Sequence, residues 1–206
     1  MRTVESLFRI KKKDKALKIF KELGYVYPGA DKVFSKGKGK GIVDKLLGLE
    51  LQYLLKFGRI YSVDAGGRDI MVLVHSKYRN LTKARMLRAF GLIGFLNRHR
   101  MFSDEEKQQK TKFAREMEVL NKEISLHEEY IFMKYLGVRE DFRKQGRGSS
   151  LANTAIRHAR KSRLPLVTCV SSMEDVGFYQ NRGFKVIGIT SSKELEIMHV
   201  YLIKEY

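Results

Sequence analysis

Hydrophobic residues recur at helical spacing in the first quarter of the chain. Residues 14–23 place Leu17, Phe20 and Leu23 on one helical face, and residues 42–57 carry Ile42, Leu46, Leu49, Tyr53 and Leu54 in a similar way. A repeat of three or four residues predicts an amphipathic helix in each segment. Residues 34–41 end in alternating lysine and glycine. They predict a flexible loop, because glycine resists regular structure.

The pattern then changes to short apolar runs. Residues 59–63 and 69–75 predict two strands, and Asp64-Ala65-Gly66-Gly67 between them is typical of a hairpin. Residues 80–98 and 104–126 predict two further helices. The second carries charges of both signs, which indicates either a solvated face or a helix lying across the body of the domain.

The second half alternates between the two periodicities. Strands are predicted at 130–138, 166–170, 184–189 and 195–203, and helices at 149–161 and 174–181. This order predicts an α/β (α+β) sheet with helices on its faces. No repeat or linker divides the sequence, so we expect residues 1–206 to form a single domain.

Composition narrows the class of protein. Of the 206 residues, 43% are hydrophobic, which is enough for a core and argues against global disorder. The longest wholly apolar run, 89–96, is too short to span a bilayer, and the N-terminus becomes charged at once. We therefore expect a cytoplasmic protein. The single cysteine, Cys169, lies in the apolar run 165–170 and is predicted to be an inert buried thiol. We predict no metal site.

The net charge is high, at +18. It is compatible with a polyanionic partner, such as nucleic acid, an acidic membrane surface or a phosphate-rich cofactor, and somewhat better with a solubilising surface. The charges are scattered along the sequence and not gathered in one stripe, which favours the solubilising surface without excluding a polyanionic partner.

Residues 136–148, Leu-Gly-Val-Arg-Glu-Asp-Phe-Arg-Lys-Gln-Gly-Arg-Gly, are the most informative stretch. They predict a strand end, a loop with the pattern R-x-x-G-x-G formed by Arg143, Gly146 and Gly148, and a helix starting at Ser149. Small residues let an anion approach the backbone, and a helix N-terminus adds its positive dipole end. The stretch therefore predicts a phosphate or pyrophosphate site.

A second informative element follows about 30 residues later. Residues 178–184, Phe-Tyr-Gln-Asn-Arg-Gly-Phe, predict a helix end with an aromatic pair and a glycine cap at Gly183. Together with Val138, Phe142, Arg143, Gly146 and Gly148, the residues Tyr179, Gly183 and Phe184 resemble the signature of the GNAT acetyltransferase superfamily. The resemblance covers about residues 129–190.

The resemblance implies a fold and a cofactor. The fold would be a mixed, mostly antiparallel central sheet splayed between the fourth and fifth strands, with helices on both faces and an extra helical pair at 80–126 before the fourth strand. Residues 1–126 would form the acceptor side and residues 127–206 the acetyl-CoA side. The residues implied to bind acetyl-CoA, with CoA as product, are Leu136, Gly137, Val138, Arg143, Lys144, Gln145, Gly146, Arg147, Gly148, Ser149 and Ser172.

The sequence departs from the family pattern at three places. Glu140 replaces a usual proline and Arg147 a usual branched apolar residue, but neither change removes a backbone N–H. The asparagine that commonly precedes the tyrosine is not at its usual spacing, and Ser171, Ser172 and Glu174 occupy that region instead.

The resemblance also implies a role for Tyr179, which would protonate the leaving thiolate. A phenol is a weak acid that can do so, although a core tyrosine with a capping hydroxyl is the alternative. The base that removes the amine proton is not marked. Glu129, His127 and Glu128 precede the central strand, Asp64 and Glu50 are weaker candidates, and a water chain could replace them all.

The sequence thus predicts an N-acetyltransferase in which an amine attacks acetyl-CoA directly. The acceptor would be a small-molecule or peptide amine, and the protein a monomer or homodimer. The alternative is a catalytically weak GNAT-like binding module for nucleic acid or another polyanion, which is possible but not favoured.

Overall fold

The computed structural model describes residues 8–23, 39–63, 66–79, 84–85, 87–91, 102–122 and 129–206. At its centre is a seven-stranded sheet in the order β1-β2-β3-β4-β5-β7-β6. The strands are β1 (Phe8–Arg9), β2 (Gly58–Ser62), β3 (Asp69–His75), β4 (Ile131–Val138), β5 (Leu166–Val170), β6 (Lys185–Ser192) and β7 (Ile197–Lys204). All neighbours are antiparallel except β4 and β5, which are parallel.

The parallel pair is open along part of its length. β4 and β5 pair from Ile131 with Leu166 to Met133 with Thr168, and no later residue of β4 has a partner on β5. At the same point the register of β4 against β3 slips, since Val72 pairs with Tyr135 and Leu73 with Met133. Lys134 is therefore the extra residue of a β-bulge, which bends a strand locally. The sheet splits here into two parts.

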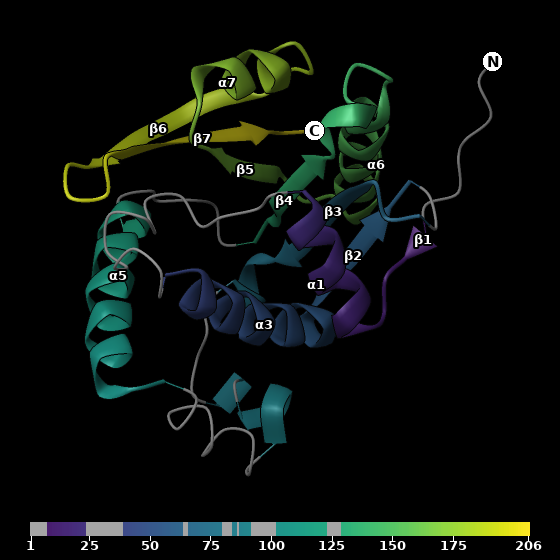
Figure 1. Ribbon diagram of the computed structural model, residues 1–206. Helices are drawn as coiled ribbons and strands as arrows, with labels where there is room; N and C mark the ends of the chain where they lie inside the picture. The colour runs from purple at the N-terminus through teal and green to yellow at the C-terminus, as the bar shows by residue number, and fades with distance from the viewer. Residues whose placement is uncertain are drawn as a thin grey trace.

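Helices cover both faces of the sheet (Figure 1). α1 (Lys13–Glu22) and α3 (Gly39–Phe57) lie on one face, and their apolar residues form a core cluster with β2 and β3. α6 (Arg147–Ser162) and α7 (Met173–Gln180) lie on the other face and pack on β3, β4, β5 and β7. We call these the α3 face and the α6 face. Each helix buries one apolar stripe, as Leu151, Ala155 and Ala159 do on α6.

A third cluster fixes α5 (Asp104–Lys122) beside the α3 face. Phe102 and Phe113 pack with Ile42 and Val43 of α3 and with Leu195 from the turn between β6 and β7. Lys45 of α3 pairs with Glu106 at 2.9 Å. Two short 3-10 helices are also present, η1 (Ser76–Tyr78) after β3 and η2 (Glu140–Phe142) after β4. Residues 84–85 and 87–91 are helical as well.

The predicted fold class is confirmed: a mixed, mostly antiparallel sheet that splays between the fourth and fifth strands, with helices on both faces. Of the helical pair predicted before β4, α5 is present, and residues 80–98 lie mostly outside the described residues. In the part of the chain that is described, no helix is long and apolar enough to cross a membrane.

Several strand ends differ from the prediction by one to three residues, and two helix starts and one strand differ in ways that matter here. The loop predicted at 34–41 is wrong at its end, since α3 already begins at Gly39, and residues 34–38 lie outside the described residues. The burial of Ile42 and Val43 draws the preceding glycines into the first turn. α6 begins at Arg147, two positions before the predicted Ser149, because Gly146 adopts the conformation that starts it. β1 was not predicted, and a two-residue strand carries no periodicity to detect.

Candidate functional site

A cavity of about 1400 Å³ follows the opening between β4 and β5. At one end it reaches the loop that joins β4 to α6, and at the other it reaches the α3 face beside η1, α5 and β7. Its lining includes most of the predicted cofactor-binding residues: Leu136, Gly137, Val138, Arg143, Lys144, Gly146, Arg147, Gly148, Ser149 and Ser172. Gln145 is not among the lining residues, and its side-chain amide donates to the carbonyl of Asp141 at 3.2 Å.

The glycine loop turns its backbone toward the cavity. Lys144 and Gly146 both have positive φ, at 59° and 79°. Gly146 is the N-cap residue of α6 and offers no side chain to cap the helix. The first backbone bond of the helix runs from Ser150 N to Gly146 O at 2.9 Å. The N–H groups of Arg147, Gly148 and Ser149 therefore belong to the turn that lacks partners within the helix, and they suit an anion.

The two glycines of the motif serve different purposes. At Gly146 a β-carbon would meet no other atom within 4 Å, so space is not the constraint there. A glycine is needed because the residue has a positive φ, which other residues rarely adopt. At Gly148 a β-carbon would meet Val138 and Phe178 at ordinary contact distances, 3.7 and 3.8 Å. Gly148 has no positive φ, so its value lies in leaving room above the first turn for a ligand.

The side chain of Arg147 is held from behind the loop. Its Nη1 lies 2.9 Å from Oδ2 of Asp69, a residue at the start of β3 with no exposed surface. The other oxygen of Asp69 accepts from Ser62 Oγ at 2.8 Å and from Val63 N at 2.7 Å. Arg147 thus anchors the start of α6 to β3, and it offers the cavity mainly its backbone.

Two other loop residues are also engaged. The Nε of Arg143 donates to the carbonyl of Val138 at 3.3 Å, which braces the end of β4. Ser149 accepts from Nη2 of Arg182 at 2.6 Å, and the guanidinium of Arg182 lies 3.7 Å from the ring centroid of Phe178. Arg182 therefore connects the end of α7 to the start of α6.

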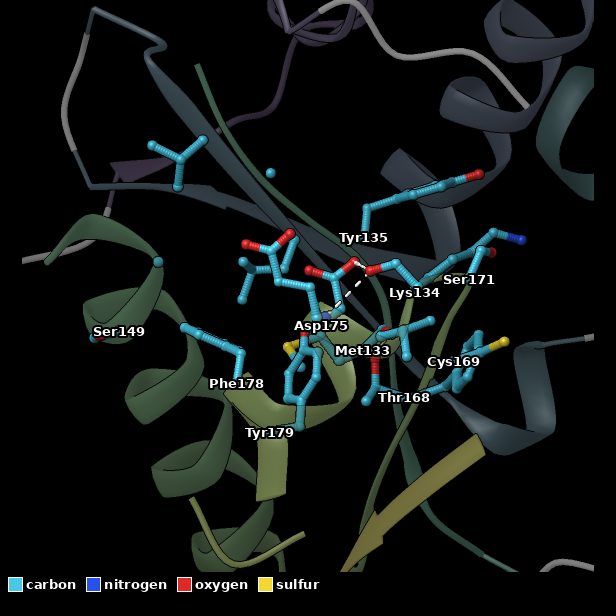
Figure 2. Close-up of a pocket in the computed structure, with 18 of the residues that line it drawn as sticks. Met133, Lys134, Tyr135, Ser149, Thr168, Cys169, Ser171, Asp175, Phe178 and Tyr179 are labelled. Carbon is cyan, nitrogen blue, oxygen red and sulfur yellow. Dashed lines mark hydrogen bonds between the residues drawn. The ribbon is translucent and has the colours of Figure 1, made fainter. Parts of the chain in front are cut away.

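Tyr179 lies at the point where β4 and β5 separate (Figure 2). Thr168, the last residue of β5 paired with β4, donates from its hydroxyl to the carbonyl of Met133 at 3.1 Å. The same hydroxyl interacts with the hydroxyl of Tyr179. The hydroxyl of Tyr179 is thereby directed at the apex of the opening.

Burial raises the pKa of Tyr179 above its ordinary value of 10, and the hydrogen bond with Thr168 opposes this only in part. The phenol is thus protonated throughout the physiological pH range. A protonated, buried phenol beside an opening can donate a hydrogen bond, and it cannot act as a base there.

Ser172 lies next to the same opening but has a structural partner. Its hydroxyl caps α7 by accepting from Asp175 N at 3.1 Å, and it donates to a carboxylate oxygen of Asp175 at 2.8 Å. The N-terminus of α7 thus has its own cap. Ser171 and Glu174 also line the cavity.

The predicted bases fall in different places. Glu129 is exposed, precedes the paired part of β4 and is not a lining residue, so its placement gives the predicted role no geometric support. Glu50 of α3 is nearly buried; it lies 2.5 Å from Lys134 Nζ and accepts from the Tyr135 hydroxyl at 2.6 Å. Lys134 and Tyr135 both line the cavity. His127, Glu128 and Asp64 lie outside the described residues.

Cys169 lines the cavity from β5, with Thr168 between it and Tyr179 (Figure 2). Burial raises the pKa of its thiol to about 12. The thiol is therefore protonated at neutral pH, as the sequence interpretation of an inert cysteine requires.

Several site residues were not predicted. Thr168, Lys134 and Tyr135 lie at the apex, and Arg79 and His199 line the cavity from the end of η1 and from β7. Asp69 of β3 holds Arg147 behind the glycine loop. Arg182 had a signal, since it stands inside the stretch 178–184 that carries the resemblance. The others had none, because strand pairing brings them together from distant segments.

Comparisons with known proteins agree with this geometry. Residues 100–186 match the family model of the acetyltransferase (GNAT) domain. A search of curated proteins finds no match to the sequence.

Among solved structures the fold is similar to several acetyltransferases. One is described as histone acetyltransferase HPA2 and related acetyltransferase from Corynebacterium glutamicum; the identity is 14%, 97% of this chain and 95% of that chain are covered, and the TM-score is 0.62. An N-acetyltransferase from Staphylococcus aureus has 12% identity, coverage of 95% and 98%, and a TM-score of 0.55. A putative GNAT-family acetyltransferase from Desulfovibrio desulfuricans has 9% identity, coverage of 97% and 98%, and a TM-score of 0.52.

At these identities the structural likeness concerns the fold alone. The sequence match over residues 100–186 includes both motifs, so the resemblance that they predicted is confirmed: this part of the chain is similar to the acetyltransferase (GNAT) domain.

Proposed function

We propose that the protein is an N-acetyltransferase that transfers the acetyl group of acetyl-CoA to an amine. The observation that carries the proposal is the single cavity that joins the glycine loop, the apex at Tyr179 and the α3 face. A long donor could lie along one arm of this cavity while an acceptor enters from the other.

The residues of the α6 face fit the donor. The N–H groups of the first turn of α6 would hold its pyrophosphate, with Arg143 and Lys144 supplying positive charge beside them. The pantetheine arm of acetyl-CoA would lie along Leu136, Gly137 and Val138, where β4 has no partner on β5. Ser172 lies across the opening and already caps α7, so we expect it to contribute through contact more than through its hydroxyl.

The apex fits the chemistry of acyl transfer. A bond forms between the amine nitrogen and the carbonyl carbon, and the bond between that carbon and sulfur breaks. The bulge at Lys134 takes backbone groups out of the regular ladder with β3, and one of its N–H groups would stabilise negative charge on the carbonyl oxygen. The Tyr179 hydroxyl would turn from Thr168 to the leaving sulfur. Because burial raises its pKa, we infer that it stabilises the thiolate mainly as a hydrogen-bond donor.

The amine must also lose a proton. Of the two predicted candidates that the structure describes, Glu50 and Glu129, it is Glu50 that contacts residues of the apex, namely Lys134 and Tyr135. Its carboxylate is already engaged by the ion pair with Lys134 and by the hydrogen bond from Tyr135. We therefore propose that water in the cavity carries the proton away, and that Glu50 serves to position Lys134 and Tyr135.

A thermal melt with ligands tests the proposal. Acetyl-CoA at about 100 times its Kd should stabilise the fold by about 2.7 kcal/mol, which raises the melting temperature by roughly 5–10 °C for a chain of this size. ATP is the control, because it carries phosphates but no pantetheine arm. Release of free CoA thiol in the presence of an amine mixture should accompany the shift. Equal stabilisation by ATP, or no shift with millimolar acetyl-CoA, would contradict the proposal.

A further inference from the structure

The end of the cavity on the α3 face is built from segments far apart in the sequence. Its lining residues are Ser76 and Arg79 at η1, Met117 of α5, Tyr130 and Phe132 before and within β4, Cys169 of β5 and His199 of β7. None of these is acidic. The acidic residues that line the cavity, Glu174 and Asp175, belong to α7 on the opposite face. The described lining of this end is therefore positively charged.

Arg79 is held in a fixed orientation. Its Nη1 donates to the Tyr130 hydroxyl at 2.9 Å. Its guanidinium lies 4.7 Å from the ring centroid of Phe132 and 5.9 Å from that of Tyr201. Aromatic rings favour a cation over their faces and keep the planar group from rotating. The Tyr201 hydroxyl also hydrogen-bonds this guanidinium. Arg79 thus brings a fixed positive charge to the lining of the cavity, and a guanidinium is the side chain best suited to a carboxylate.

His199 lies at the same end and has an unsatisfied polar atom. The residue is 6% exposed and lines the cavity, and its Nδ1 has no hydrogen-bond partner within the described residues. Burial and the nearby charge of Arg79 lower the pKa of the imidazole, so the ring is neutral at pH 7 and can donate from one nitrogen. A buried polar group without a partner is costly, and a ligand that pairs with it removes that cost.

We propose that Arg79 and His199 form a subsite for a carboxylate, so that the acetyl acceptor is an amine that also carries a carboxylate, as an amino acid does. The inference rests on the proposed acetyl transfer to an amine. β7 is the neighbour of β5, and strands in a sheet lie about 5 Å apart, so His199 is within reach of a small acceptor whose nitrogen is at the apex. Phe132, Tyr130 and Met117 would contact the apolar part of such an acceptor.

The subsite makes polycationic acceptors unfavourable. A polyamine or a lysine in a basic peptide would bring positive charge to Arg79, and like charges repel in a partly buried site. The inference thus separates two kinds of acceptor that the cofactor side of the molecule treats alike.

Matched pairs of amines test it. Phenylalanine is compared with phenylethylamine, and lysine with pentane-1,5-diamine, each pair differing by one carboxylate; a lysine-containing basic peptide is added. Release of CoA thiol gives kcat/KM for each. We expect each carboxylate-bearing member that is accepted to exceed its partner by about 10- to 150-fold, the worth of a charge-assisted hydrogen bond.

Variants locate the effect. Arg79→Met keeps the apolar stem and removes the donors, and it should abolish the preference within each pair while leaving KM for acetyl-CoA unchanged. Arg79→Lys keeps the charge without the planar fork and should retain part of the preference. Arg157→Met removes one positive charge from the exposed side of α6 and should change neither.

The outcomes separate this inference from the proposed function. Absence of stabilisation by acetyl-CoA removes the proposed function and this inference with it. If acetyl-CoA stabilises the fold, three results overturn the subsite alone. These are equal use of both members of each pair, preference for the diamine or the basic peptide, and failure to acetylate any amine that carries a carboxylate. Survival of the preference in Arg79→Met also overturns it, and because wild-type preference is measured directly, poor folding of a variant does not hide the answer.

Discussion

The two arms of the cavity are built in different ways. On the α6 face, the groups suited to a phosphate are backbone N–H groups from one short stretch, residues 143–149, and the turn there is fixed by Gly146. On the α3 face, the groups are side chains such as Arg79 and His199, which strand order and α5 bring together. Backbone recognition needs a local conformation, whereas side-chain recognition needs a tertiary arrangement.

This difference has a consequence for evolution of specificity. A single substitution on the α3 face changes one donor or one charge and leaves the sheet in place. A substitution in the glycine loop alters the backbone itself, through which the phosphate site is made. We therefore expect acceptor choice to vary with few changes, and donor choice to be fixed by the fold.

The largest effect is expected at the apex, where the two arms meet. Tyr179→Phe removes the hydroxyl and keeps the buried ring, which packs against Phe178 and Phe184 at centroid distances of 5.0 and 5.3 Å. An interaction made only in the transition state appears in kcat, so kcat should fall by about 10²–10⁴-fold while the Kd of acetyl-CoA changes little. Steady-state kinetics paired with a thermal melt measure both.

The matched control is Tyr53→Phe. Tyr53 is also a buried tyrosine, and its hydroxyl donates to the carbonyl of Tyr78 at 2.9 Å away from the apex. The Tyr53→Phe variant should keep kcat within about twofold of wild type. It loses a tyrosine hydrogen bond, but that bond is not one to the leaving group. The raised pKa of Tyr179 also predicts no fall of kcat below pH 10 from its ionisation. Wild-type turnover in a folded Tyr179→Phe variant would make Tyr179 a core residue.

A smaller effect is expected in the donor arm. Gly148→Asp adds a side chain and a negative charge at the first turn of α6, where the β-carbon itself fits but a pyrophosphate would not. Loss of a charge-assisted contact costs on the order of 1.5–3 kcal/mol, so the Kd of acetyl-CoA should rise by at least roughly 10- to 100-fold.

Calorimetry measures the Kd of this variant, and Gly41→Asp is its control. Gly41 lies in the first turn of α3, where a β-carbon would have no atom within 4 Å. Gly41→Asp therefore adds the same side chain and charge at the start of another helix. Normal binding by a folded Gly148→Asp would mean that the loop is structural.

The contrast between the arms also explains how much of the molecule was predictable. The sheet, α6, α7 and the glycine loop follow from periodicity and from the turn that Gly146 requires, all of which are local. Arg79 and His199 stand in ordinary positions of the sequence, and only the pairing of β5 with β7 and the return of β3 beside β4 give them a shared cavity. The role of Arg147 was also beyond the sequence, because its partner Asp69 is 78 residues away.

Asp69 shows that the division between the arms is not a division of the chain. It belongs to β3, in the half predicted to serve the acceptor, yet its carboxylate holds Arg147 at the start of the donor-binding helix. Asp69→Asn keeps the shape of the side chain and removes its charge. If the new amide oxygen keeps the hydrogen bond from Val63 N, its NH₂ group faces Arg147, and two donors then oppose each other. The first-turn N–H groups remain, so only their placement is loosened, and KM for acetyl-CoA should rise about 2- to 10-fold, the worth of one net hydrogen bond. KM for the acceptor should not change, whereas a general loss of stability would affect both KM values.

Ser62→Ala is the control, since it removes a 2.8 Å bond to the other oxygen of the same carboxylate and leaves the Arg147 pair intact. A parallel rise of both KM values in Asp69→Asn, or an equal effect of Ser62→Ala, would show that Asp69 only supports the fold; a selective rise for acetyl-CoA would place this residue of the acceptor half among those that position the donor.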